Sequence, residues 1–254
     1  MTQLIDECKV MALMNDMLVQ SMIIRDITQR TCSKPTRRRI LELGSGGGGW
    51  TKIIHKLSEE SGNPPLDVGW TLVENFMWME DNYQGDWPTT KEELREAVKD
   101  MIPHAILENI YDHSVTQLIS DREFNNCYNN NISFMRIDVS ATYQEIEHLI
   151  KHNLDDDAMI IIDDTRMNCG IERIYLLFEL IRNNLGYPVW FGEKESMLCK
   201  NPDRAKFYSN WLAEALKEKN YNIYWNQEYK VFFGIDCYFT TTTPFNIFVS
   251  QVKE

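Results

Sequence analysis

Short apolar runs alternate with segments of helical periodicity along most of the chain. Apolar runs bounded by polar or turn residues predict strands at 39–43, 68–74, 104–110, 132–138 and 158–164. Apolar residues at helical spacing predict helices at 49–60, 91–101, 141–152, 170–184 and 203–219, with a shorter helical stretch ending near residue 120. This alternation predicts an α/β fold with a doubly wound, mostly parallel sheet.

Three segments depart from the alternating pattern. We expect residues 1–35 to form an N-terminal helical lid and residues 75–104 to form an insertion, with Thr90 and Glu93 as a capping box. Residues 186–254 form a C-terminal elaboration, and their pattern predicts an antiparallel hairpin from 221–227 and 230–242. Residues 125–131 are expected to be a polar loop. We expect all 254 residues to form a single domain.

Composition excludes several classes of function. The formal net charge of −12 counts against nucleic-acid binding, which needs clustered Lys and Arg. The one basic cluster, residues 34–39, is interpreted as a solvated lead-in to the first strand. The six cysteines form no Cys-x-x-Cys pair, and no apolar run approaches the length of a membrane span. We therefore expect a cytoplasmic protein without a membrane segment, and its oligomeric state stays open.

A glycine-rich loop follows the first predicted strand, with five glycines among residues 44–49. A ligand would approach this loop closely, because its glycines have no Cβ and tolerate positive φ. The residues expected to contact it are Gly44, Ser45, Gly46 and Gly48. The spacing fits a dinucleotide fingerprint. With Glu42 it also resembles the acid-and-glycine pattern of class I S-adenosylmethionine methyltransferases. A carboxylate beside a pyrophosphate would repel it, whereas adenosylmethionine carries positive charge, so Glu42 favours the latter cofactor.

Acidic residues occupy the carboxyl ends of the predicted strands, where open α/β sheets bind ligands. Glu74 ends the second strand and could accept hydrogen bonds from a ribose diol. Asp112 and His113 follow the third strand, where an adenine would lie. Trp50 would contribute an apolar wall to the cofactor site.

A second acidic group, Asp138, Asp163 and Asp164, follows the fourth and fifth strands. Neighbouring strands lie about 4.8 Å apart, so these carboxylates would repel one another if uncompensated. A divalent cation such as Mg²⁺ would remove this conflict and would lower the pKa of a bound hydroxyl. The alternative is structural: Asp163 caps the next element, and Asp138 pairs with a base such as Arg166.

Residues 38–185 resemble the class I methyltransferases. The segments Met135–Asp138 and Ile160–Asp164 are similar to those of metal-dependent small-molecule O-methyltransferases of the macrocin and catechol types. This resemblance implies that Asp138, Asp163 and Asp164 ligate Mg²⁺, with Asp138 and Asp163 as catalytic residues beside the methyl donor. The sequence departs from these families at Ser140, Ala141 and Thr165, so the catalytic base is unassigned among His113, His148 and Lys194.

The sequence therefore favours a metal-assisted O-methyltransferase acting on a hydroxyl of a small molecule such as a sugar or natural product. Two alternatives stay open. The turn Gly48–Thr51 resembles that of RNA 2′-O-methyltransferases, although the acidity of the chain counts against RNA. The chain could also bind adenosylmethionine without catalysing transfer. A nicotinamide-dependent oxidoreductase is the weakest of the alternatives.

Overall fold

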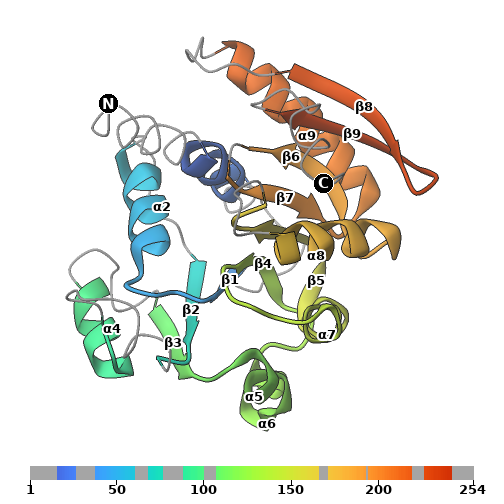
Figure 1. The fold of residues 1–254 in the computed structure, drawn as a ribbon. Helices are drawn as coiled ribbons and strands as arrows, with labels where there is room; N and C mark the ends of the chain where they lie inside the picture. The colour runs from blue at the N-terminus through green and yellow to red at the C-terminus, as the bar shows by residue number, and fades with distance from the viewer. Residues whose placement is uncertain are drawn as a thin grey trace, which may run out of the picture. The chain divides into compact units, whose positions relative to one another are not determined.

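The computed structural model describes residues 16–26, 38–60, 68–76, 88–99, 107–165, 171–192, 194–218 and 226–241. These residues belong to two compact units (Figure 1). One unit comprises residues 24–155, and the other comprises residues 1–23 together with 156–254. The expectation of one domain stays a prediction.

The unit of residues 24–155 contains four parallel strands in the order β3-β2-β1-β4. They are β1 (Arg38–Leu43), β2 (Val68–Glu74), β3 (Leu107–Asp112) and β4 (Ile132–Ile137). Leu43 lies opposite Val73 on one side and Ile137 on the other, so the carboxyl ends of the three strands are level. The chain steps outward from β1 to β3 and then returns to the far side of β1, which makes the β1–β4 boundary the topological switch point.

Five helices connect or follow these strands within the described part of the unit: α2 (Gly49–Glu60), α4 (Lys91–Val98), α5 (Val115–Ser120), α6 (Arg122–Cys127) and α7 (Tyr143–His152). Side-chain caps fix where several of them begin. Ser114 and Gln117 form a capping box at α5, and Thr142 and Glu145 form another at α7. The core lies among the strands, and every residue of β2 and β4 is buried.

The other unit contains a mixed sheet in the order β5-β7-β6-β9-β8. Its strands are β5 (Leu154–Ile162), β6 (Tyr187–Phe191), β7 (Ser196–Cys199), β8 (Asn226–Phe232) and β9 (Ile235–Thr241), and its helices include α8 (Ile171–Arg182) and α9 (Pro202–Glu218). β7 is antiparallel to β5 and β6, β9 is parallel to β6, and β8 and β9 form the hairpin drawn in orange to red in Figure 1. Residues 16–26 are helical.

The predicted α/β class is confirmed, with mostly parallel strands in the first unit and a C-terminal antiparallel hairpin. The third strand was placed too early: β3 ends at Asp112 because its register against β2 continues to the Glu74–Asp112 pair. The predicted polar loop was wrong over residues 125–127. Asp121 caps α6 by accepting from the N–H groups of Glu123 and Phe124, which allows the buried Phe124 to anchor a helical turn.

Two further differences concern the C-terminal elaboration. The short strands β6 and β7 were not predicted. The hairpin turns at Phe233 and Gly234, whose φ values are +52° and +82°, rather than near residue 228. Positive φ at both central residues gives a two-residue turn whose twist matches that of the strands. A phenylalanine in that conformation is uncommon, so the sequence carried little signal for the turn.

No described helix is both long enough and apolar enough to cross a membrane.

Candidate functional site

The glycine loop lies at the switch point, directly after β1. Gly44, Gly46 and Gly48 have φ values of +78°, +51° and +70°. The N–H groups of Gly44 and Ser45 donate to the Val73 carbonyl at 2.9 and 3.2 Å, which ties the loop to the end of β2. A Cβ on Gly44 would lie 2.2 Å from the carbonyl oxygen of Asp138. Both the backbone angle and the close approach therefore require glycine at this position.

Glu74 closes the other side of the loop. Its carboxylate is buried, and Oε2 accepts a hydrogen bond from the Gly46 N–H at 2.8 Å while Oε1 accepts from the Asn75 N–H at 3.1 Å. A loop amide that could face an anionic ligand is thus directed at a carboxylate of the protein itself. An ionised carboxylate has about four lone-pair sites, so Glu74 can accept further bonds from a ligand.

A small pocket opens between this loop and β3. It encloses about 200 Å³, including open solvent, and is lined by Leu43, Gly44, Val73, Glu74, Asn75, His113, Val115 and Val139. The enclosed part of this hollow has room for about one water molecule, with one acidic group among mostly apolar walls.

His113, which directly follows β3, lines this pocket. Asp112 is exposed, and its carbonyl oxygen is hydrogen-bonded to Nδ1 of His113. The other ring nitrogen of His113, Nε2, lies 3.1 Å from the carboxylate of Asp121, the cap of α6. His113 is thus positioned by α6 and β3 together, and its place beside a cofactor stays a prediction.

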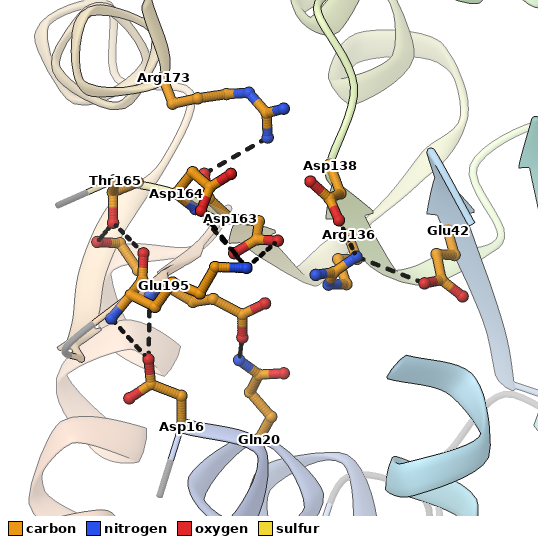
Figure 2. A network of polar contacts seen from close by, with 12 residues as sticks. Asp16, Gln20, Glu42, Arg136, Asp138, Asp163, Asp164, Thr165, Arg173 and Glu195 are labelled. Carbon is orange, nitrogen blue, oxygen red and sulfur yellow. Dashed lines mark hydrogen bonds and ion pairs between the residues drawn. The ribbon is translucent and has the colours of Figure 1, made fainter. Parts of the chain in front are cut away.

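Glu42 and Asp138 share one buried cation, Arg136 (Figure 2). Arg136 Nη1 lies 3.4 Å from Glu42 and 3.0 Å from Asp138, and the arginine side chain is 5% exposed. The hydroxyl of Thr51 donates to Glu42, which is 1% exposed. The charge of Glu42 is therefore compensated inside the protein and does not face the pocket.

Trp50 packs in the same cluster. Its ring centroid lies 5.7 Å from that of Trp70, and the guanidinium of Arg136 lies 5.4 Å from its centroid. Trp50 is 4% exposed and is not among the residues that line the pocket. Its main role in this structure is to pack the start of α2 against the sheet, and its contact with a cofactor stays a prediction.

The acid pair Asp163 and Asp164 lies in the other unit, after β5, and is bridged by Lys194. Lys194 Nζ is 3.1 Å from both carboxylate oxygens of Asp163 and 3.4 Å from Asp164. Asp163 is fully buried and accepts from the N–H of Asp164, whose φ of +55° turns the chain. A side-chain ammonium therefore occupies the position between the two acids.

The segment that carries Lys194 and Glu195 is held by the helix of residues 16–26, and Figure 2 shows Asp16 and Gln20 beside Glu195. Oδ2 of Asp16 accepts from the N–H groups of Lys194 and Glu195 at 2.8 and 3.1 Å, and Gln20 donates to the Glu195 carboxylate. Thr165 donates to the Lys194 carbonyl through its N–H at 2.9 Å. No local pattern indicates the contact between Asp16 and Lys194, because 178 residues separate them.

The predicted metal ligands fall in different units, Asp138 in one and the pair Asp163 and Asp164 in the other. Each has a basic side chain at ion-pair distance, and Arg136 is the described base beside Asp138. Arg166 lies outside the described residues. A shared cation at these acids stays a prediction.

Of the candidate bases, His148 is not among the residues that line the pocket. It lies on α7, and its ring centroid is 4.5 Å from that of His152. Burial, and then the neighbouring His152, lower the pKa of His148. Lys194 and His113, in contrast, lie beside the acid pair and the pocket respectively.

Comparisons with known proteins are distant. No family model and no curated protein matches the chain. Among solved structures, a methyltransferase from Geobacter sulfurreducens is 11% identical, with 70% of this chain and 76% of that chain covered and a TM-score of 0.43. The O-methyltransferase NovP is 13% identical, with 72% and 80% covered and a TM-score of 0.47. Spermidine synthase from Thermotoga maritima is 14% identical, with 68% and 56% covered and a TM-score of 0.44. At such similarity the assignment of function depends on this chain's own residues.

Proposed function

We propose that the chain is an S-adenosylmethionine-dependent methyltransferase. The observation that carries this proposal is the hydrogen bond from the Gly46 N–H to Glu74 at the edge of the pocket. In a dinucleotide site, loop amides and the helix start are left to receive a pyrophosphate. Here the buried carboxylate of Glu74 accepts from the loop amide instead. Its negative charge disfavours a phosphate and is compatible with adenosylmethionine, which carries a positive sulfonium.

The residues around the loop have distinct roles in this proposal. Glu74 accepts hydrogen bonds from the ribose hydroxyls, Gly44 and Gly46 let the ligand approach the backbone, and Asp112 with His113 border the adenine. The cofactor supplies an activated methyl group, so transfer forms a bond from the acceptor to the methyl carbon and breaks the carbon–sulfur bond. The protein's contribution is to align these atoms and exclude water.

Calorimetric titration is expected to show binding of adenosylmethionine and no comparable binding of NAD. Glu74→Gln should weaken adenosylmethionine binding about 10- to 100-fold, because a hydrogen bond to a charged group contributes about 1.5–3 kcal/mol. Glu96→Gln, at an exposed glutamate of α4, is the matched control and should bind like the wild type. Tighter binding of NAD than of adenosylmethionine would refute the proposal.

We further propose that the reaction is metal-assisted O-methylation of a small hydroxylated molecule. Carboxylate oxygens are the donors that Mg²⁺ prefers, and Asp163 and Asp164 present theirs to one cation already, the ammonium of Lys194. A bound divalent cation would supply a Lewis acid for the acceptor hydroxyl. In that state Lys194 would be released from the acid pair, and after losing a proton to solvent its neutral amine could take the hydroxyl proton.

This finer proposal has its own test. Mg²⁺ or Mn²⁺ added to the chelator-treated protein should give a saturable binding signal in calorimetry, and Asp163→Asn should weaken it at least about tenfold through the loss of one anionic ligand. Asp156→Asn, at an acid that is 91% exposed, should leave the signal unchanged. If the wild type binds neither ion and EDTA leaves methyl transfer intact, the metal is ruled out while the cofactor proposal still stands.

A further inference from the structure

The outer strand of the C-terminal hairpin, β8, has one edge without a pairing strand in the part of the chain that the structure describes. β8 is the last strand in the sheet order, and among the described residues only β9 pairs with it. Open edges of this kind favour pairing with another strand unless they are covered or interrupted. β8 carries no proline or glycine that would interrupt such pairing.

The register of the hairpin determines which backbone groups face outward. Phe232 and Ile235 flank the two-residue turn and therefore form a hydrogen-bonded pair. Such pairs alternate along an antiparallel ladder, so the backbone groups of residues 228 and 230 also face β9. Those of Gln227, Tyr229 and Val231 consequently point away from β9, toward the open edge.

We propose that the chain forms a two-fold symmetric dimer in which β8 pairs antiparallel with β8 of a second copy, centred on Tyr229. In this register Tyr229 faces its own counterpart, and Gln227 faces Val231 of the other copy. The outward N–H and C=O groups of all three residues would then form hydrogen bonds with the second copy. A two-fold axis allows this pairing because it joins the same strand edge of both copies.

Charge complementarity selects this register. Glu228 would lie opposite Lys230 of the second copy, and the symmetry repeats this contact with the charges exchanged. These are non-hydrogen-bonded pairs, in which side chains approach most closely. Within one copy Glu228 and Lys230 already lie on the same side of the strand, 3.5 Å apart, so the ends of both side chains are near the required positions.

The opposite side of the hairpin carries exposed apolar groups. Tyr229, Val231, Phe233 and Tyr238 are 48%, 56%, 58% and 41% exposed. Tyr229 and Tyr238 are cross-strand neighbours with ring centroids 4.8 Å apart. Pairing through β8 would place the two copies of this patch side by side, and contact between them would bury apolar surface. The inference is independent of the proposed enzymatic activity.

Sedimentation velocity of the full chain tests this dimer. The wild type is expected to move from monomer to twice the chain mass as its concentration rises through the micromolar range. Lys230→Glu and Glu228→Lys should each weaken association about tenfold or more, because each places like charges opposite one another twice. An equimolar mixture of the two single variants should associate again as a heterodimer, since all opposing charges are then opposite in sign.

The mixture separates pairing from misfolding, because neither variant folds better in the presence of the other. The double variant Glu228→Lys/Lys230→Glu should form its own dimer and should not pair with the wild type. Lys151→Glu, which reverses an exposed charge on α7, is the control and should associate like the wild type. A wild type that stays monomeric, or single variants that dimerise like it, would overturn the proposal.

Discussion

Arg136→Met is expected to lower the free energy of unfolding by about 3–5 kcal/mol, the usual cost of removing one partner from a buried ion pair. Arg136 is the cation between Glu42 and Asp138 and is almost fully buried. Its loss leaves Glu42 as a buried carboxylate without that compensation. Urea denaturation of both proteins at neutral pH measures the difference.

Two further variants identify the cause of this loss. In Arg136→Met/Glu42→Gln the uncompensated charge is gone, so we expect the double variant to regain part of the lost stability relative to Arg136→Met alone. Such a departure from additivity is the signature of two groups in direct contact. Arg136→Lys retains the charge and should lose less than Arg136→Met. If Arg136→Met unfolds within about 0.5 kcal/mol of the wild type, as ordinary surface changes do, the ion pair is not important for stability.

The interior of the 24–155 unit was the most predictable part of the chain. Strand β2 and helix α2 have the predicted bounds, because each is bordered by strong local signals: turn residues before Val68 and the glycine loop before Gly49. The helix α7 begins near its predicted start because Thr142 and Glu145 cap it locally. In each case neighbours in sequence determine the structure.

Other features depend on partners that are remote in sequence. The strands β6 and β7 are short and lie on either side of the segment that Asp16 holds through Lys194 and Glu195. Nothing local in residues 187–199 indicates that contact. The same holds for Lys194, which the sequence offered as one candidate base among several and which the structure places between Asp163 and Asp164.

The acid that faces the glycine loop is not the one that the sequence indicated. The sequence favoured adenosylmethionine because Glu42 would repel a pyrophosphate. In the structure Glu42 is buried beside Arg136 and does not line the pocket. The carboxylate that faces the loop is Glu74, from the neighbouring strand. Both acids end predicted strands, but only tertiary structure distinguishes the one that holds Arg136 from the one that borders the ligand.

Gly44→Ala is expected to remove adenosylmethionine binding and to destabilise the fold by about 2–5 kcal/mol. A residue with a Cβ at positive φ costs about 1–2 kcal/mol, and the forced contact adds about 1–3 kcal/mol. The new methyl group would lie 2.2 Å from the Asp138 carbonyl oxygen, a backbone atom that cannot rotate away. To relieve that contact, either the end of β1 or the start of the segment after β4 must move. Because Gly44 and Val139 both line the pocket, either movement changes the pocket's shape.

Gly49→Ala provides the matched control five residues away. A Cβ at Gly49 meets no atom within 4 Å, and Gly49 is the first residue of α2. Alanine there should be neutral or stabilising by less than about 1 kcal/mol, since it restricts the unfolded chain without straining the helix. Thermal unfolding with and without adenosylmethionine measures both effects for each variant. A Gly44→Ala protein that keeps the stability and the ligand response of Gly49→Ala would show that the loop neither requires its backbone geometry nor contacts the cofactor.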